Sequence, residues 1–596
     1  MSKGKIFFAS ILAVLAWWCA NKVTWQVRTD QEAGRDFSQI INRFTLDLTA
    51  HPLHISFAGA DVLGGFGGIA LVLLIALYMY GARKPTRPGE EQGSARWAKP
   101  SEARKFVGDR KTDMLFTRTE SLNLDSRKTQ RNLNALIIGS SGSGKSRYYV
   151  MPNLAQANTS FLVTDPKGEV QRAMGQRLKD KGYEIRSLNL IDFDRSDTFN
   201  PLRYFNPEQA EVDCAILVEN LITNTSGQKP SGGSDFWEKA ERALLTAFVS
   251  YIYFTKGAQG TLIDVVDMLA KMQASEENEE ATSEVDAIFS VAKECVEVFD
   301  QNPDEYDEEA TIMLNGLRFA CSQYNIYTQG AGETKKSIII SLGVRMAPLH
   351  MAQLRRILGS DTIDADQVGK RRSAIFLVIP DSHQAFSFIA SIFYELFFER
   401  NMYLADHNPS GRLEVPVQCF MDEFANIGLI PKFEKLIATI RSREISASII
   451  LQAQSQLKAI YKDNADTIVG NCDSTLFLGG KEKTTLKELS ETLGKETIDL
   501  YNTSETRSNQ KSFGLNYQKT GKELMSQDEI TVMDGSKCIF QLRGVRPFLS
   551  DKFDITKHKN YKLLEDYDKK NLFDIESYMK RRGKAKLNKN TVIMKL

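Results

Sequence analysis

Eight residues of this sequence, Gly139 to Ser146, have the types and the spacing needed to hold a triphosphate. They read GSSGSGKS and fit the phosphate-binding pattern G-x4-G-K-[S/T] at every required position. An apolar run, Ala135–Ile138, precedes them, and a segment that can be helical follows. A Gly- and Ser-rich turn is the alternative reading, but composition alone rarely yields the complete pattern. We therefore predict a nucleoside triphosphate site.

Each residue type in this loop has its own predicted task. Glycines permit backbone angles that side chains forbid, so that successive N–H groups can surround phosphate oxygens. Lys145 is expected to reach the β- and γ-phosphates, and Ser146 to offer its hydroxyl to Mg²⁺. The start of the following helix also attracts the anion. The predicted ligands of ATP and Mg²⁺ are Gly139, Ser140, Ser141, Gly142, Ser143, Gly144, Lys145 and Ser146.

A phosphate-binding loop needs a second, acidic element that completes the Mg²⁺ shell and positions water. The apolar run Val417–Met421 is followed directly by Asp422 and Glu423. We expect Asp422 to join the Mg²⁺ ligand sphere and Glu423 to polarise the attacking water as general base. Strand ends commonly carry exposed acidic residues, so this pair alone does not indicate a catalytic site. The phosphate-binding loop earlier in the chain is what supports the assignment.

Four further polar positions are candidates for the same site. Gln452 ends the run Ala447–Leu451, and its amide could sense the γ-phosphate. Arg441 and Arg443 precede that run, and an arginine there could stabilise charge on the transferring phosphoryl group across a subunit boundary. An exposed arginine pair is an equally good reading of the spacing. Asp165 follows another apolar run and is expected near the nucleotide, with its role left open.

Composition places the chain among globular proteins of several domains. The 596 residues are 42% hydrophobic and 25% charged, and the net charge is +1. A DNA-binding surface would therefore have to be local. Seven well-separated cysteines without a C-x-x-C pair argue for a reducing compartment, and against a disulfide framework or structural zinc.

Two apolar segments near the N-terminus predict membrane spans. Ile6–Ala20 is short, so a signal-peptide core competes with a span, whereas Leu63–Tyr80 is apolar throughout. A buried core helix is the alternative for the second segment. Basic residues flank both segments outside the loop 21–54, where four basic and four acidic residues cancel. The positive-inside rule then predicts a multi-pass protein of the cell membrane with its nucleotide domain in the cytoplasm.

The remaining chain predicts an α/β fold. Short strand-like runs alternate with helix-period stretches, as in a parallel sheet covered on both faces. The strand-like runs are Ala135–Ile138, Phe161–Thr164, Ile185–Leu190, Ala374–Ile379, Val417–Met421, Ala447–Leu451, Thr475–Leu478 and Cys538–Leu542. Helical patterns replace them over 207–345, the clearest being Gln209–Asn224, Phe236–Phe254, Ile263–Met272 and Val285–Val298.

We therefore predict five regions. They are a membrane anchor (1–82), a linker (83–115), a nucleotide-binding domain in two parts (116–206 and 346–560), an inserted all-α subdomain (207–345) and a basic C-terminal tail (561–596). The tail could touch membrane phosphates or DNA, and a disordered solubilising tail explains its composition equally well.

Several longer strings resemble the conjugative coupling protein family of type IV secretion systems in its Gram-positive form. The most specific run from MDEFANIG (421–428) to IRSREISASIILQAQSQL (440–457). Others cover nearly the whole chain after the membrane segments: GSARWA (93–98), FLVTDPKGE (161–169), FNPL (199–202), DFWEKAERALL (235–245), VIPDSHQAFSF (378–388), NCDSTLFLGG (471–480), ETLGKETID (491–499) and RGVRPF (543–548).

The resemblance implies a RecA-like P-loop ATPase domain with an inserted all-α subdomain and two N-terminal transmembrane helices, hexameric when active. Such a motor recruits a relaxase–DNA complex and passes single-stranded DNA to the channel subunits, with the all-α subdomain helping to recognise the substrate. The family's arginine stands eleven residues before its sensor glutamine, which favours Arg441 over Arg443. Ser146 replaces the threonine of many relatives and keeps the hydroxyl.

Two other functions remain open from the sequence. The protein could be an ATP-gated substrate receptor that does not pump, or a chromosome-partitioning translocase of double-stranded DNA. Proteins of the second kind usually carry more spans and a C-terminal winged helix, and neither is evident here.

Overall fold

The computed structural model describes residues 3–81, 87, 89–226, 235–273, 282–506 and 512–585. It consists of two compact units, Met1–Glu91 and Gln92–Leu596. The predicted linker 83–115 is divided between them, since its later residues Ala103, Phe106 and Met114 are buried in the second unit.

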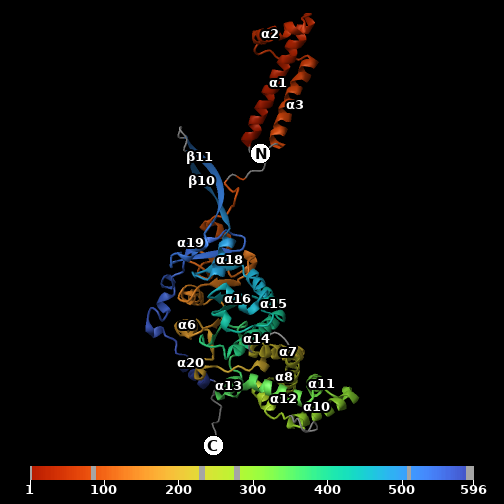
Figure 1. Cartoon of the computed structure of the whole chain (residues 1–596), viewed down its shortest axis with the longest axis vertical. Coiled ribbons are helices and arrows are strands. Elements are labelled where there is room, and N and C mark those ends of the chain that lie inside the picture. Colours follow the sequence, from red (N-terminus) through yellow and green to blue (C-terminus); the bar gives the residue numbers. More distant parts are fainter. Residues whose placement is uncertain are drawn as a thin grey trace. The chain divides into compact units, whose positions relative to one another are not determined.

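The first unit is a helical hairpin with a short helix between its arms (Figure 1). Its helices are α1 (Lys3–Glu32), α2 (Phe37–Ala50) and α3 (Gly59–Gly81). The arms pack closely because α3 has glycines at the contact. A Cβ added at Gly68 would lie 2.6 Å from the carbonyl oxygen of Ala16. Arg28 Nη2 and Asp61 Oδ2, 2.8 Å apart, join the same two helices.

One described helix is long and apolar enough to cross a membrane, over Gly59–Tyr78, with a mean hydropathy of 2.2. It overlaps most of the second predicted span, Leu63–Tyr80. The first predicted span, Ile6–Ala20, falls within α1, but the side chains of residues 1–9 lie outside the described part of the chain. That span therefore stays a prediction.

The second unit is built on a nine-stranded sheet in the order β13-β12-β9-β3-β8-β7-β4-β6-β5. All eight strand-like runs belong to it. The strands are β3 (Ala135–Ile138), β4 (Ser160–Thr164), β5 (Glu184–Asn189), β6 (Ser373–Val378), β7 (Val417–Met421), β8 (Ile445–Leu451), β9 (Ser474–Phe477), β12 (Lys537–Leu542) and β13 (Phe548–Asp551).

Seven of these strands are parallel, and the sheet departs from the predicted all-parallel pattern at one edge. There β12 runs antiparallel to β9, and β13 antiparallel to β12. A turn between β12 and β13 suffices for such a pair, whereas a parallel neighbour requires a crossover.

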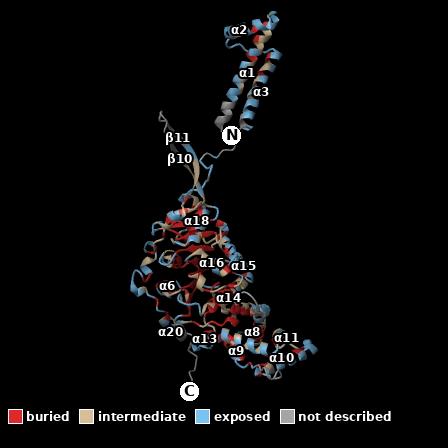
Figure 2. Ribbon diagram, viewed as in Figure 1, coloured by how far each residue is buried: buried red, intermediate tan, exposed pale blue. Residues whose placement is uncertain are grey.

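Buried side chains cover both faces of the sheet, as the concentration of buried residues around it shows (Figure 2). Alternation along β3 sends Leu136 and Ile138 to one face and Ala135 and Ile137 to the other. The surrounding helices include α5 (Met151–Gln156), α6 (Glu169–Asp180), α14 (Ser387–Asp406), α15 (Phe433–Thr439), α16 (Gln454–Tyr461), α17 (Asn464–Gly470), α18 (Lys483–Leu493) and α19 (Gln527–Thr531). Short elements β1 (Met114–Leu115), β2 (Ser121–Leu122) and α4 (Ser126–Thr129) precede β3.

Between β5 and β6 the described residues form helices and connecting segments but no strand. The helices are α7 (Ala210–Thr225), α8 (Asp235–Lys256), α9 (Leu262–Leu269), α10 (Glu284–Gln301), α11 (Glu308–Thr328), α12 (Gly332–Met346) and α13 (Ala352–Leu358). The first four match the helical patterns of the sequence. The bounds 207 and 345 of a separate subdomain remain a prediction.

Two parts of the second unit differ from the sequence-based expectation. A long antiparallel hairpin, β10 (Lys495–Thr506) and β11 (Ser512–Glu523), extends from the region of α18 and α19 (Figure 1). The region predicted as a basic tail packs on the sheet domain up to α20 (Ile575–Ala585), with Leu564 and Phe573 buried. Residues 586–596 of that tail lie outside the described residues.

Candidate functional site

A cleft of about 560 Å³ opens at the carboxyl edge of the parallel strands. The phosphate-binding loop follows β3, and Asp165, Asp422 and Gln452 follow β4, β7 and β8. Parallel strands bring their carboxyl ends to one edge, which is why residues as far apart in sequence as Ser140 and Gln452 line the same cleft. The site is therefore assembled by the topology of the sheet.

The loop has the backbone that phosphate binding requires. Gly142 and Gly144 have φ angles of +78° and +86°, in the region that favours glycine. The chain turns helical at Ser146, where a five-residue helix, η2 (Ser146–Val150), leads into α5. Lys552, which follows β13, donates from Nζ to the Ser143 carbonyl at 3.1 Å and so ties the loop to the C-terminal part of the chain.

Lys145, Glu423 and Gln452 meet at the centre of the cleft. Lys145 Nζ lies 3.4 Å from Glu423 Oε1 and donates to the Gly139 carbonyl at 3.1 Å. Gln452 Nε2 lies 3.1 and 3.0 Å from the two oxygens of the same carboxylate. The structure thus brings these three predicted residues together, and the Glu423 side chain is fixed in position by a cation and an amide.

Glu423 also has an unusual backbone. Its φ angle is +50°, which is rare for a residue with a side chain, and costs of order 1–3 kcal/mol. Strain of this kind persists only where the surrounding structure imposes it. Here the strained residue lies two positions after the end of β7, and its carboxylate lines the cleft beside Asp422.

Asp422 and Ser146 form a candidate magnesium site. Ser146 Oγ donates to Asp422 Oδ2 at 2.7 Å, and Asp422 is 3% exposed. Burial raises the pKa of Asp422, while the hydrogen bond from Ser146 and the charge of Lys145 lower it. A bound cation would remove the cost of the buried charge. A hydroxyl and a carboxylate at this spacing match the oxygen ligands that Mg²⁺ prefers, so the residues present fit the ion.

Asp165, whose role the sequence left open, is the second buried carboxylate of the cleft. Its Oδ2 accepts the backbone N–H of Gln171 at 2.7 Å. Burial raises its pKa to about 6, with the charge of Asp422 adding to the rise and the hydrogen bond opposing it. Two buried acids on neighbouring strand ends therefore favour a cation between the loop and β4.

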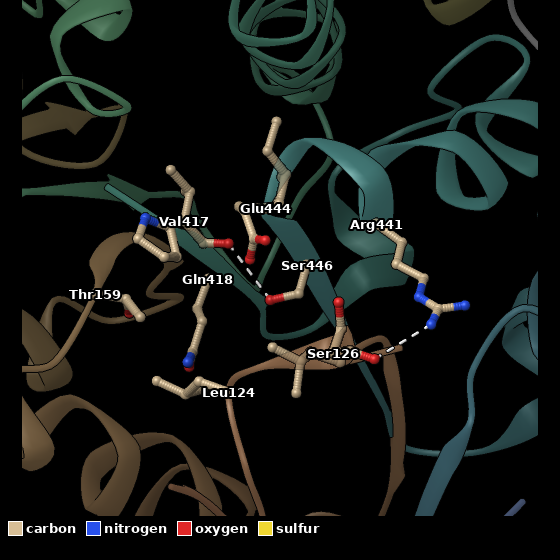
Figure 3. A pocket seen from close by; sticks show the side chains of 11 residues that line it. Leu124, Ser126, Thr159, Val417, Gln418, Arg441, Glu444 and Ser446 are labelled. Carbon is tan, nitrogen blue, oxygen red and sulfur yellow. Dashed lines mark hydrogen bonds between the residues drawn. The ribbon is translucent and has the colours of Figure 1, made fainter. Parts of the chain in front are cut away.

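Arg441 lies elsewhere. It belongs to a short helix, η11 (Ile440–Arg443), which precedes β8 and therefore lies at the amino edge of the sheet. Its Nη2 donates to the Ser126 carbonyl at 3.4 Å, and it lines a small cavity with Gln418 and Glu444 (Figure 3). The seven residues of β8 extend roughly 20 Å, so Arg441 does not reach the cleft of its own chain. Arg443 pairs with Asp406 at 2.8 Å.

The C-terminal region supplies cleft residues that the sequence did not reveal. Glu565 and Asp566 line the cleft, and Asp566 Oδ2 lies 2.6 Å from Nη1 of Arg147, the residue after the loop. Glu565 Oε2 lies 3.7 Å from Arg172 Nε on α6. No motif marks these positions, because only the packing of the chain's last part brings them there.

Comparison with known proteins decides the family. The family model described as "Type IV secretory system Conjugative DNA transfer" matches residues 96–592. The chain belongs to this family, that of the conjugative coupling proteins. A search of the curated proteins found no match.

Solved structures of another coupling protein share the fold. The bacterial conjugative coupling protein TrwBdeltaN70, in an unbound form, has a TM-score of 0.52 at 13% identity, over 78% of this chain and 95% of that one. TrwB in complex with a non-hydrolysable ATP analogue has a TM-score of 0.50 at 13% identity, over 79% and 96% of the two chains. At this identity the likeness establishes the mixed α/β fold with its central, mainly parallel sheet.

Proposed function

We propose that this coupling protein is a Mg²⁺-dependent ATPase that drives single-stranded DNA into a type IV secretion channel. The observation that carries the proposal is the meeting of Lys145, Ser146, Asp422, Glu423 and Gln452 in one cleft, with hydrogen bonds or ion pairs linking Ser146 to Asp422 and Glu423 to Lys145 and Gln452. Its membership of the DNA-transfer family supplies the substrate class.

The geometry suggests a division of labour. Loop amides and the Lys145 ammonium hold the phosphate oxygens, and Ser146 and Asp422 hold Mg²⁺, which when bound offsets negative charge on the phosphates. Glu423 accepts a proton from the attacking water as general base. Gln452, which donates to both oxygens of that carboxylate, keeps it in place and senses whether Glu423 is engaged.

Arg441 then has to act on a neighbouring subunit. It lies at the amino edge, too far from the cleft of its own chain, yet a finger must contact the transferring phosphoryl group. We propose that the active form is a homo-hexamer in which Arg441 completes the next subunit's site. The all-α region is proposed to recruit the relaxase–DNA complex, and α1 and α3 to anchor a cytoplasmic motor to the cell membrane as two spans.

Turnover by the full chain in the presence of single-stranded DNA tests the catalytic assignment. Lys145→Ala and Glu423→Gln should each lower DNA-stimulated ATP hydrolysis at least about 100-fold, the lower bound for a general base. Glu169→Gln is the matched control, because Glu169 also lines the cleft but is exposed and lies off the reacting centre. Undiminished hydrolysis by Glu423→Gln would remove the general-base role.

The two other functions predict different results. A receptor that does not pump would support DNA transfer at normal frequency with the Glu423→Gln substitution. A chromosome-partitioning translocase would be stimulated by double-stranded DNA more than by single strands. Preferential stimulation by single strands, together with loss of transfer in Glu423→Gln, is the result that our proposal requires.

A further inference from the structure

A second hollow, of about 400 Å³, lies at the opposite edge of the sheet from the cleft. Five cationic residues line it, and no carboxylate is among the described residues that line it. They are Lys111, Arg177, Lys181, Arg372 and Lys559. The position follows from the topology, because Arg372 immediately precedes β6 and Asn158, also in the lining, lies just before the parallel strand β4.

These cations lack the acidic partners that other cations of the same region have, and within the described part of the chain Lys559 Nζ donates only to the Lys111 carbonyl, at 2.6 Å. Arg371 pairs with Glu184 at 2.6 Å, and Arg172 with Glu565 at 3.7 Å. Among the described residues, none of the five forms an ion pair within 4 Å. Arg177 is 7% exposed, and its Nε has no hydrogen-bond partner. A buried N–H without a partner is costly, and the cations around it have no acidic partner, so the hollow favours a ligand rich in acceptors.

The charges in the hollow also repel one another. Burial lowers the pKa of the Lys559 amine, and Lys111, Arg177 and Lys181 lower it further, against the opposing charge of Asp109. Burial likewise lowers the pKa of Arg177. An anion with several oxygens would relieve this repulsion and use the unpaired donors at once.

We propose that this hollow binds phosphodiester groups of the transported DNA strand, an inference that rests on the proposed DNA-transfer function. Phosphate oxygens match the unpaired guanidinium and ammonium groups. A lining without aromatic rings suits contacts to the backbone, which are independent of base sequence. The only apolar side chains of the lining are Leu124, half-buried, and Ala157, buried, so little is offered for insertion into a membrane surface.

Helix α6 connects the hollow to the nucleotide cleft. Its first turns contribute Glu169 and Ala173 to the cleft, and Arg177 near its end lines the hollow. Twelve residues of helix extend about 18 Å. The chain from Lys559 to Asp566 makes the same connection, so two elements link the phosphate hollow to the ATP site.

The test is the salt dependence of oligothymidine binding by the full chain, with Mg-ADP filling the cleft. The variant Lys181→Ala/Lys559→Ala removes two exposed cations of the hollow and leaves the buried Arg177 untouched. The control Lys179→Ala/Lys557→Ala makes the same charge change two positions earlier in the chain at each site, outside the hollow. ATP hydrolysis without DNA should be unchanged in both variants, which shows that the fold and the cleft are intact.

If each lysine contacts one phosphate, the slope of log K against log salt should become less steep by about 1.4, and affinity at moderate salt should fall about tenfold. The control should match the wild type. Equal slopes for the wild type and the hollow variant would overturn the inference while leaving the proposed function standing. A loss confined to sedimentation with phosphatidylglycerol vesicles would overturn it too, by assigning the hollow to the membrane. Absence of wild-type DNA binding would instead remove the proposed function itself.

Discussion

The two edges of the central sheet handle charge in opposite ways. At the carboxyl edge nearly every charged group has a partner: Lys145 with Glu423, Ser146 with Asp422, and Arg147 with Asp566. At the amino edge the cations of the hollow form no ion pair within 4 Å among the described residues, and Lys559 donates only to a backbone carbonyl. Side chains that bind one another can exchange these contacts for contacts with the nucleotide and form them again after release. Donors without an acidic partner instead favour a bound polyanion. The contrast suggests chemistry at one edge and strand binding at the other.

The largest effect is expected at Arg441, which lies at the amino edge of its own sheet but is proposed to act at the carboxyl edge of a neighbouring subunit. Arg441→Ala should lower hydrolysis by about 10³–10⁵-fold, the range for arginine fingers. Mixing Arg441→Ala with Lys145→Ala subunits should restore part of the activity, since one intact site can form between unlike neighbours.

The matched control is Arg443→Ala mixed in the same way, because Arg443 is engaged by Asp406 and should affect hydrolysis little. Failure of rescue at every mixing ratio would confine Arg441 to its own chain. The amino edge of one subunit would then contribute no residue to the nucleotide cleft of the next.

Asp165 tests whether burial of charge at the carboxyl edge has the expected cost. Its pKa of about 6, against 3.8, means that the folded state holds the proton more tightly. The associated stability is present below pH about 4 and is lost as pH rises through about 6. The rise of this pKa from 3.8 to about 6 corresponds to about 3 kcal/mol, so Asp165→Asn should raise the thermal unfolding midpoint measured at pH values above 7.

Little of that gain should remain below pH about 4, where Asp165 is neutral in the native protein. Glu169→Gln, an exposed acid of the same cleft, should shift the midpoint little at either pH. An equal gain for Asp165→Asn at both pH values would show that packing, and not charge, is responsible.

The smallest effect is expected from the Arg147–Asp566 pair. Arg147 is 46% and Asp566 35% exposed, so solvent screens the 2.6 Å contact and its coupling energy should be below about 1 kcal/mol. Thermal unfolding of the wild type, Arg147→Ala, Asp566→Ala and the double variant gives this coupling energy as a double-mutant cycle. A coupling energy of several kcal/mol would mean that the Arg147–Asp566 pair stabilises the fold by holding the C-terminal region against the cleft.

The strands and the cleft were largely predictable, for a local reason. A fully buried strand reads as a continuous apolar run, and the glycine pattern of the loop has one main use, so β3 and β7 and the residues after them could be placed from the sequence. The hairpin β10–β11 was missed, because it has no continuous apolar run, and none of its residues 495–501 and 517–523 is buried. The strand β12 was predicted from its apolar run, but its antiparallel direction was not, because an apolar run does not carry the direction of the strand.

What the sequence indicated by itself is the phosphate-binding pattern from Gly139 to Ser146 and the candidate acidic partners Asp422 and Glu423. These residues could be assigned because their spacing is local and because the carboxyl ends of parallel strands meet at one edge of a sheet. Only the tertiary structure decided that Lys552, Glu565 and Asp566 flank the same cleft, that Arg441 lies at the other edge, and that five scattered cations form one hollow. Those relations depend on which distant segments pack together, and no local pattern of residue types encodes that.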